Sequence, residues 1–171
     1  MQVNLERSFL GKIGLQIGKV FPQFDATIWQ VKRKRHCAQQ SKALSALASQ
    51  LPRKGMTERP IHLVVTAHHG PDAHNWHIAG GNIGFETFRS AVELLGEENV
   101  SLFGAGKDEP EIAWHSRLLE LMAEKKATHL IGQIEIDPNQ ASNWSWDVLA
   151  TVFNEYWDGV FIGLMYDSAF E

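Results

Sequence analysis

The most regular feature of the chain is an alternation, from residue 61 onward, of short apolar runs with longer amphipathic stretches. The apolar runs read IHLVVTA, NVSLFGAG, THLIGQIEID and GVFIGLMYD. Short and nearly continuous apolar runs are typical of strands that are buried on both faces of a sheet. Four strands are therefore expected, at residues 61–67, 99–106, 128–137 and 159–167.

Each gap between these strands contains a sequence with helical periodicity. Helices are predicted at residues 82–96, 109–127 and 143–157, and in the first of them Phe85, Phe88 and Leu95 share one face. Strand starts about 30 to 40 residues apart are typical of parallel βαβ units. The fold class expected is therefore α/β, with an open, Rossmann-like, mostly parallel sheet and helices on both faces.

The first third of the chain has a different character. A helix is predicted over residues 25–51, and PRKGMTERP at 52–60 interrupts it with two prolines and a glycine. The expected organisation is an N-terminal helical segment, residues 1–58, followed by a Rossmann-like domain, residues 59–171. The sequence ends soon after the fourth strand, which leaves part of one sheet face uncovered. Either the chain is half of a larger protein with a second α/β domain, or the helix of 25–51 covers that face.

Composition narrows the class of protein. Hydrophobic residues make up 44% and charged residues 21% of the chain, as in globular proteins, and the net charge of −4 gives no general sign of nucleic-acid binding. The basic run KRKRH at 32–36 is interpreted as a solvated helix face, with a patch for an anionic partner as the alternative. The single cysteine, Cys37, excludes an internal disulfide and a cysteine zinc cluster. No apolar run is long enough to span a bilayer, and we expect a cytoplasmic protein.

The densest candidate chemistry lies in TAHHGPDAHNWHIAGG, residues 66–81, which directly follows the first predicted strand. In open α/β sheets, ligands bind at the carboxyl ends of the strands. The potential metal ligands there are His68, His69, Asp72, His74 and His77. Their spacing matches no helical zinc motif, and adjacent histidines of an extended chain point in opposite directions. We therefore expect no bound metal or other cofactor, and a metal-dependent hydrolase is a minor alternative.

A strand that ends in His-Gly, as in VVTAHHG, is similar to the caspase-like and CHAT families, whose catalytic histidine lies at that place. Those families have a nucleophilic cysteine after the next strand. Here that strand reads NVSLFGAGKD, with no cysteine, and its Ser101 lies inside the strand. Because a histidine needs a nucleophile as partner, only an inactive relative fits this pattern.

The glycines point to another family. In AGGNIGFETFRSAVELLGEENVSLFG, residues 79–104, a Gly-Gly pair precedes an amphipathic helix and then a strand. This order resembles the first βαβ unit of GT-B glycosyltransferases, in which a Gly-Gly loop opens the helix ahead of the second strand. Residues 128–167 resemble the next unit of that family, in which a strand ends at a polar acceptor-site loop and the following strand ends in an acidic dipeptide, here Tyr166–Asp167. The resemblance covers about residues 60–171.

The resemblance implies the N-terminal, acceptor-binding half of an enzyme that transfers a sugar from a nucleotide-sugar to an acceptor hydroxyl. A carboxylate or imidazole would be the general base, and most donor contacts would come from the second domain. The implied catalytic residues are His69, Asp137 and Asp167, and the implied donor-diphosphate contacts are Gly80 and Gly81. Position at the strand ends adds His68, His77, Asn82 and Tyr166 as substrate-binding residues, and ring stacking adds Trp76. A non-catalytic α/β binding or regulatory module remains the alternative.

Overall fold

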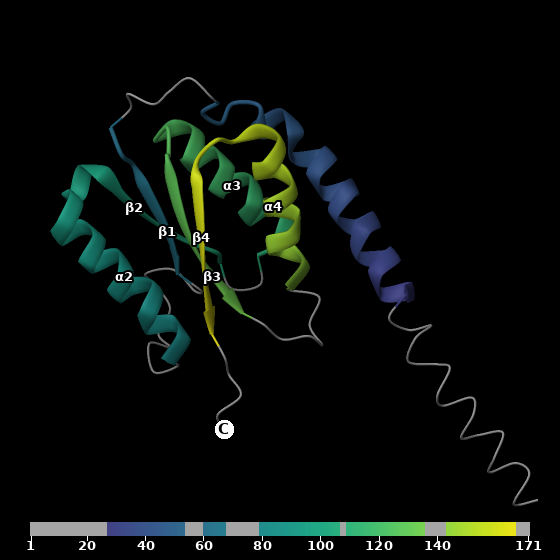
Figure 1. The fold of residues 1–171 in the computed structure, drawn as a ribbon, viewed down its shortest axis with the longest axis horizontal. Coiled ribbons are helices and arrows are strands. Elements are labelled where there is room, and N and C mark those ends of the chain that lie inside the picture. Colours follow the sequence, from purple (N-terminus) through teal and green to yellow (C-terminus); the bar gives the residue numbers. More distant parts are fainter. Residues whose placement is uncertain (1–26, 54–59, 68–78, 107–108, 136–142, 167–171) are drawn as a thin grey trace, which may run out of the picture. The chain divides into compact units, whose positions relative to one another are not determined.

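The computed structural model describes residues 27–53, 60–67, 79–106, 109–135 and 143–166 (Figure 1). A helix over residues 27–48, here called the N-terminal helix, precedes an alternating series of strands and helices. In chain order the series is β1 (Leu63–Ala67), α2 (Ala79–Leu95), the short 3-10 helix η1 (Glu97–Asn99), β2 (Val100–Gly104), α3 (Glu111–Glu124), β3 (His129–Glu135), α4 (Asn143–Tyr156) and β4 (Val160–Tyr166).

The four strands form one parallel sheet in the order β2-β1-β3-β4. Leu63 at the start of β1 pairs with Val100 of β2 on one side and with His129 of β3 on the other. Helix α2 covers one face, and α3 and α4 cover the opposite face (Figure 1). The predicted α/β fold class, with a parallel sheet and helices on both faces, is confirmed.

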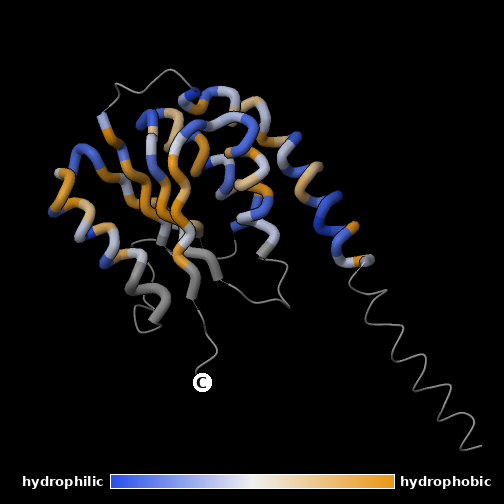
Figure 2. The backbone as a smooth tube through the Cα atoms, in the orientation of Figure 1, coloured by the Kyte–Doolittle hydropathy of each residue, from blue (hydrophilic) through white to orange (hydrophobic). Residues whose placement is uncertain are grey.

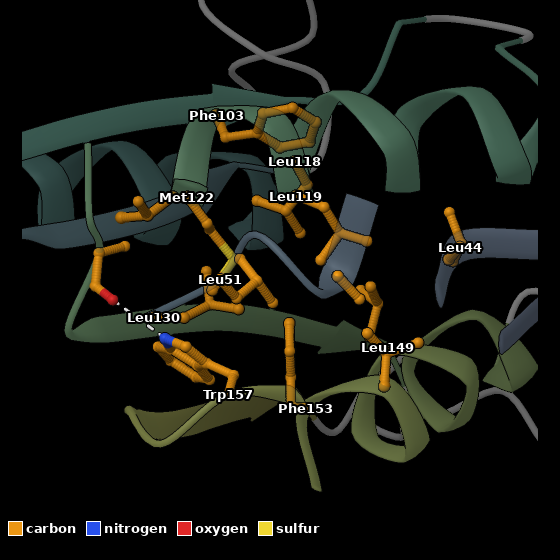
Figure 3. Close-up of a cluster of buried hydrophobic side chains, with 14 of the residues drawn as sticks. Leu44, Leu51, Phe103, Leu118, Leu119, Met122, Leu130, Leu149, Phe153 and Trp157 are labelled. Atoms are coloured by element: carbon orange, nitrogen blue, oxygen red, sulfur yellow. Dashed lines mark hydrogen bonds between the residues drawn. The ribbon is translucent and has the colours of Figure 1, made fainter. Parts of the chain in front are cut away.

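Alternate side chains of the central strands enter two separate cores. Val64 and Leu130 face α3 and α4, where they join a cluster of fully or nearly fully buried side chains (Figure 3). Val65 and Ile131, their neighbours in sequence, pack on the α2 side. This alternation follows from the two-residue period of a strand, and it explains why the strands are orange along most of their length in Figure 2.

The α2 face is not covered over its whole width. On β4, the edge strand, Val160 and Ile162 are 50% and 44% exposed. Leu44, Ala48 and Leu51, from the end of the N-terminal helix and just after it, belong to the cluster with α3 and α4. The C-terminal part of this helix therefore lies on the opposite side of the sheet, and it does not cover Val160 and Ile162.

The chain divides into two compact units, residues 1–36 and residues 37–171. The boundary falls within the N-terminal helix, after its basic run. Residues 37–48 of this helix thus belong to the unit that contains the sheet.

The helix boundaries have local causes. Gly96 ends α2 with a φ of 87°, a conformation that glycine adopts without a steric penalty, and its N–H donates to the Val92 carbonyl at 2.9 Å. The start of α2 differs from the expected one, because the helix begins at Ala79 rather than Asn82. Gly80 and Gly81 therefore lie in the first helical turn and not in a preceding loop.

Trp157 fixes the connection between α4 and β4. This residue directly follows the end of α4, and its side chain is buried. Its Nε1 donates a hydrogen bond to the Ala127 carbonyl at 3.0 Å (Figure 3). Gly159 follows closely, and a Cβ there would collide with the Trp157 ring and with the Thr128 carbonyl. A glycine is needed at this position because the indole ring occupies the space of a side chain.

Candidate functional site

The carboxyl ends of all four strands lie at one edge of the sheet, since the strands are parallel (Figure 1). Helices α2, α3 and α4 each follow a strand and therefore begin at the same edge. Along the chain, β1 is followed by β2 on one side, while β3 and β4 are added on the other. The strand order thus reverses between β1 and β3, and such a switch point is where open α/β sheets bind their ligands.

The first turn of α2 contributes backbone groups to this edge. It contains Gly80, Gly81 and Asn82, three of the residues that the sequence marks as substrate-binding. The first four N–H groups of a helix have no partner inside the helix, and together with the helix dipole they favour an anion. Two successive glycines leave these N–H groups unshielded by any Cβ. The arrangement is chemically suited to a phosphate or carboxylate.

The loop between β2 and α3 is held by one ion pair. Arg117 donates from Nε to Oε1 of Glu109 at 2.8 Å and from Nη2 to Oε2 at 2.6 Å. The same Nη2 donates to the Gly104 carbonyl at 3.0 Å, and the Gly106 N–H donates to the Glu109 carboxylate at 2.7 Å. The guanidinium also lies 5.1 Å from the centre of the Phe103 ring. These bonds tie the end of β2 to the first half of α3.

The same contacts favour the ionised form of the Glu109 carboxyl group. The hydrogen bonds from Arg117, and next the bond from the Gly106 N–H, hold the pKa of the Glu109 carboxyl below its ordinary value. Hydrogen bonding to Glu109 likewise raises the pKa of Arg117. Glu109 is therefore an ionised structural partner and is poorly suited to act as a general base.

A second link joins the first turns of α3 and α4. The buried Ser145 donates from Oγ to the Glu111 carboxylate at 2.8 Å. The ring of Trp146, the next residue along α4, stacks on the ring of Phe161 from β4, with the two ring centres 5.4 Å apart. A Cβ on Gly132 of β3 would lie 2.6 Å from the Trp146 ring, so only glycine leaves room for this stack. Aromatic rings are thus packed tightly between α4 and the middle of β3 and β4.

Most of the predicted site residues lie outside the described residues. The backbone of Tyr166 is described, and it pairs with Glu135 at the carboxyl ends of β4 and β3. Together with Gly80, Gly81 and Asn82, it belongs to the carboxyl edge of the sheet. The remaining predicted residues, which fall outside the described part of the chain, are His68, His69, Trp76, His77, Asp137 and Asp167.

Within the described ranges, no three histidine, cysteine or acidic side chains are grouped so that they could hold a metal ion. The histidines and the aspartate of residues 68–77 lie outside these ranges, so the absence of a metal stays a prediction. The helices in the described ranges also include none with the length and apolar character needed to cross a bilayer.

Sequence reasoning did not find the Glu109–Arg117 pair or the Gly132–Trp146 contact. Both residues of the ion pair are common surface residues eight positions apart, and only the bend between β2 and α3 brings them together. The space above Gly132 depends on where α4 crosses β3, which no local pattern reports. The weak available signal was an isolated glycine inside an apolar strand, which is typical of a close approach by another group.

Searches with protein-family models, against characterised proteins and against solved structures found no match for this chain.

Proposed function

We propose that this domain binds a phosphate-containing ligand at the carboxyl edge of its sheet and is the acceptor-side half of a GT-B-type glycosyltransferase. The observation that supports the proposal most strongly is the position of two glycines in the first turn of α2, beside the switch point between β1 and β3. The helix N-terminus would stabilise the donor diphosphate and, later, the diphosphate that leaves.

In the proposed reaction the acceptor hydroxyl oxygen attacks the anomeric carbon of the donor sugar. A new carbon–oxygen bond forms while the bond from that carbon to the donor diphosphate breaks, and the nucleoside diphosphate leaves with the bonding electron pair. The hydroxyl proton passes to a general base, for which His69, Asp137 and Asp167 are the candidates. Glu109 is not among them because Arg117 and Gly106 already occupy its oxygens.

The test is sugar transfer by the natural protein that contains this chain, measured as release of nucleoside diphosphate from a panel of nucleotide-sugars. Gly81→Val places a branched side chain over the exposed N–H groups, and we expect kcat/KM to fall about a hundredfold. Ser90→Val introduces the same side chain at an exposed position of α2 and is the matched control. Serine and valine have similar helix propensities, so this control should change stability by no more than about 0.5 kcal/mol and leave kcat/KM within about twofold.

Two results contradict the proposal in different ways. Unchanged turnover in Gly81→Val shows that the first turn of α2 does not contact the donor. If the protein binds nucleotide-sugars but releases no nucleoside diphosphate with any acceptor tested, the result favours a non-catalytic binding module instead.

A further inference from the structure

Charge is distributed very unevenly along this chain. Residues 1–57 contain ten of the 16 lysines and arginines but only two of the 20 acidic residues, which gives this segment a net charge of +8. The remainder of the chain carries −12, so that the overall value of −4 conceals the difference. Between residues 26 and 57 there is no aspartate or glutamate. A strong asymmetry of this kind indicates that the basic segment has an anionic partner.

Residues 27–48, most of the described part of the basic segment, form the N-terminal helix. The N-terminal helix presents Lys32, Arg33, Lys34 and Arg35 in a single turn, and three of them are exposed while Arg33 is half-buried. The Arg33 guanidinium lies 5.5 Å from the centre of the Trp29 ring. Lys32, Lys34 and Arg35 are exposed to solvent, and the sequence of this helix contains no aspartate or glutamate.

Exposed apolar side chains lie immediately beside these charges. Ile28, Trp29 and Val31 are 47%, 38% and 54% exposed, and they are three of the seven large hydrophobic side chains that are exposed in the described residues. Ile28 and Val31 line one apolar hollow with the stem of Lys32. Basic and apolar positions are interleaved along these turns (Figure 2). The upstream sequence has the same mixture, with Phe9, Ile13, Ile17 and Phe21 among Arg7, Lys12 and Lys19.

This combination distinguishes between two anionic partners. Nucleic acid offers phosphates and base faces but no apolar layer that would cover Ile28 and Val31. A bilayer surface offers lipid phosphates at the level of the charges, and beneath them an interface that accepts aliphatic and indole side chains. Lysine and arginine stems can lie along that interface while their charged ends reach the headgroups.

We propose that residues 27–36 form a binding site for the surface of an anionic phospholipid bilayer. Ile28 and Val31, which share one face of the helix with Lys32, enter the interface, and Lys32, Lys34 and Arg35 contact the headgroup phosphates. The contact is peripheral and mainly electrostatic, because charges surround this short helical stretch and the apolar side chains are few. The site is independent of the ligand site at the carboxyl edge of the sheet.

The test is co-sedimentation of the full chain with vesicles of phosphatidylcholine alone or of phosphatidylcholine mixed with the anionic lipid phosphatidylglycerol. We expect binding to the anionic vesicles only, with an affinity that falls as salt is raised. Each basic residue near such a surface contributes roughly a fivefold gain, so Lys34→Gln with Arg35→Gln should weaken binding about 25-fold.

The matched control removes two positive charges elsewhere. Lys125→Gln with Lys126→Gln changes two exposed lysines that follow α3 and should alter vesicle binding less than twofold. Ile28→Ser with Val31→Ser tests the apolar part and should weaken binding several-fold at constant charge. Circular dichroism and thermal unfolding of every variant verify that the fold is retained.

Three outcomes overturn the proposal. The first is equal binding to neutral and anionic vesicles, or no binding to either. The second is an equal loss of binding in the Lys34 and Arg35 double variant and in the control variant of Lys125 and Lys126. Equal losses would show that binding depends on the total charge and not on this site. The third is tighter binding to a single- or double-stranded oligonucleotide than to anionic vesicles at the same phosphate concentration, which would assign the basic turn to nucleic acid.

Discussion

Among the described residues, the two faces of the sheet bury very different numbers of side chains, although these side chains alternate along the same strands. On the α3 and α4 face, Val64 and Leu130 belong to a cluster of fifteen buried residues. On the α2 face, the corresponding cluster has four buried members among the described residues, and Ile162 of β4 is 44% exposed. Because hydrophobic stabilisation scales with buried apolar area, the α3 and α4 face provides most of the hydrophobic stabilisation that comes from the described residues.

This difference separates the roles of the helices. Helix α2 carries the glycines of the proposed ligand site and packs on the face with the smaller cluster of buried residues. Helices α3 and α4 contribute their buried side chains to the larger cluster. Substitutions on α2 can therefore affect binding without unfolding the domain, and substitutions under α3 and α4 will act first on stability. The sharpest comparisons use neighbouring residues that differ only in the face they occupy.

The largest effect is expected from truncation of adjacent residues on β3. Leu130→Ala opens a cavity in the fully buried cluster and should lower the free energy of unfolding by about 3–4 kcal/mol. Ile131→Ala, on the α2 side, removes a half-buried side chain and should cost about 1–2 kcal/mol. Denaturant unfolding measures both. Equal losses would show that the two faces contribute equally.

A smaller effect is expected from glycines that pair across β3 and β4. Gly132→Ala places a Cβ against the Trp146 and Phe161 rings, at 2.6 and 2.7 Å, and should destabilise the domain by about 1–3 kcal/mol. Gly163, its register partner, is exposed, and Gly163→Ala should change stability by less than about 1 kcal/mol. If Gly132→Ala is tolerated as well as its control, the aromatic stack above β3 is not tightly packed.

A polar substitution on the exposed part of the α2 face should change the free energy of unfolding very little. Ile162→Thr keeps a β-branched side chain on the edge strand, and we expect a change within about 0.5 kcal/mol in thermal or denaturant unfolding. A loss above about 2 kcal/mol would mean that this side chain is covered in solution.

The smallest effect on stability is expected from His62, at the amino end of β1 on the α3 and α4 face. Its Nε2 lies 2.9 Å from Ser101 Oγ. Burial, and then the charge of Lys125, lowers the pKa of His62 below its ordinary value of 6.5. The unfolded chain therefore takes up a proton at higher pH than the folded chain, and stability should decrease as the pH falls below about 6.5. His62→Gln should flatten this part of a stability–pH profile. An unchanged slope would assign it to other histidines.

The sequence predicted the strands and helices because their hydrophobic periods are clear, but it misplaced boundaries that depend on glycine. Helix α2 starts at Ala79 because a first turn needs no intrahelical bonds to its N–H groups, so Gly80 and Gly81 do not prevent it. The contact of Glu109 with Arg117 depends on the bend between β2 and α3, and that of Gly132 with Trp146 depends on where α4 crosses β3; local patterns report neither.

The candidate site was predictable in part. The resemblance to GT-B enzymes implied Gly80 and Gly81, and the rule that ligands bind at the carboxyl ends of parallel strands added Tyr166; the backbones of all three lie at that edge. The roles of these residues, and the places of His69 and Asp137 outside the described ranges, stay predictions. A histidine-rich loop has no repeating pattern from which a conformation could be derived.

The central claim is that the carboxyl edge beside α2 binds a phosphate-containing ligand. The most direct measurement is an amide NMR titration of the 171-residue chain with a nucleoside diphosphate, and with inorganic phosphate as a reference. We expect the largest shift changes in the first turn of α2, at Gly80 and Gly81, and at the ends of β1 and β3. Changes centred at the opposite edge, near His62 and Thr128, or no saturable changes at all, would contradict it.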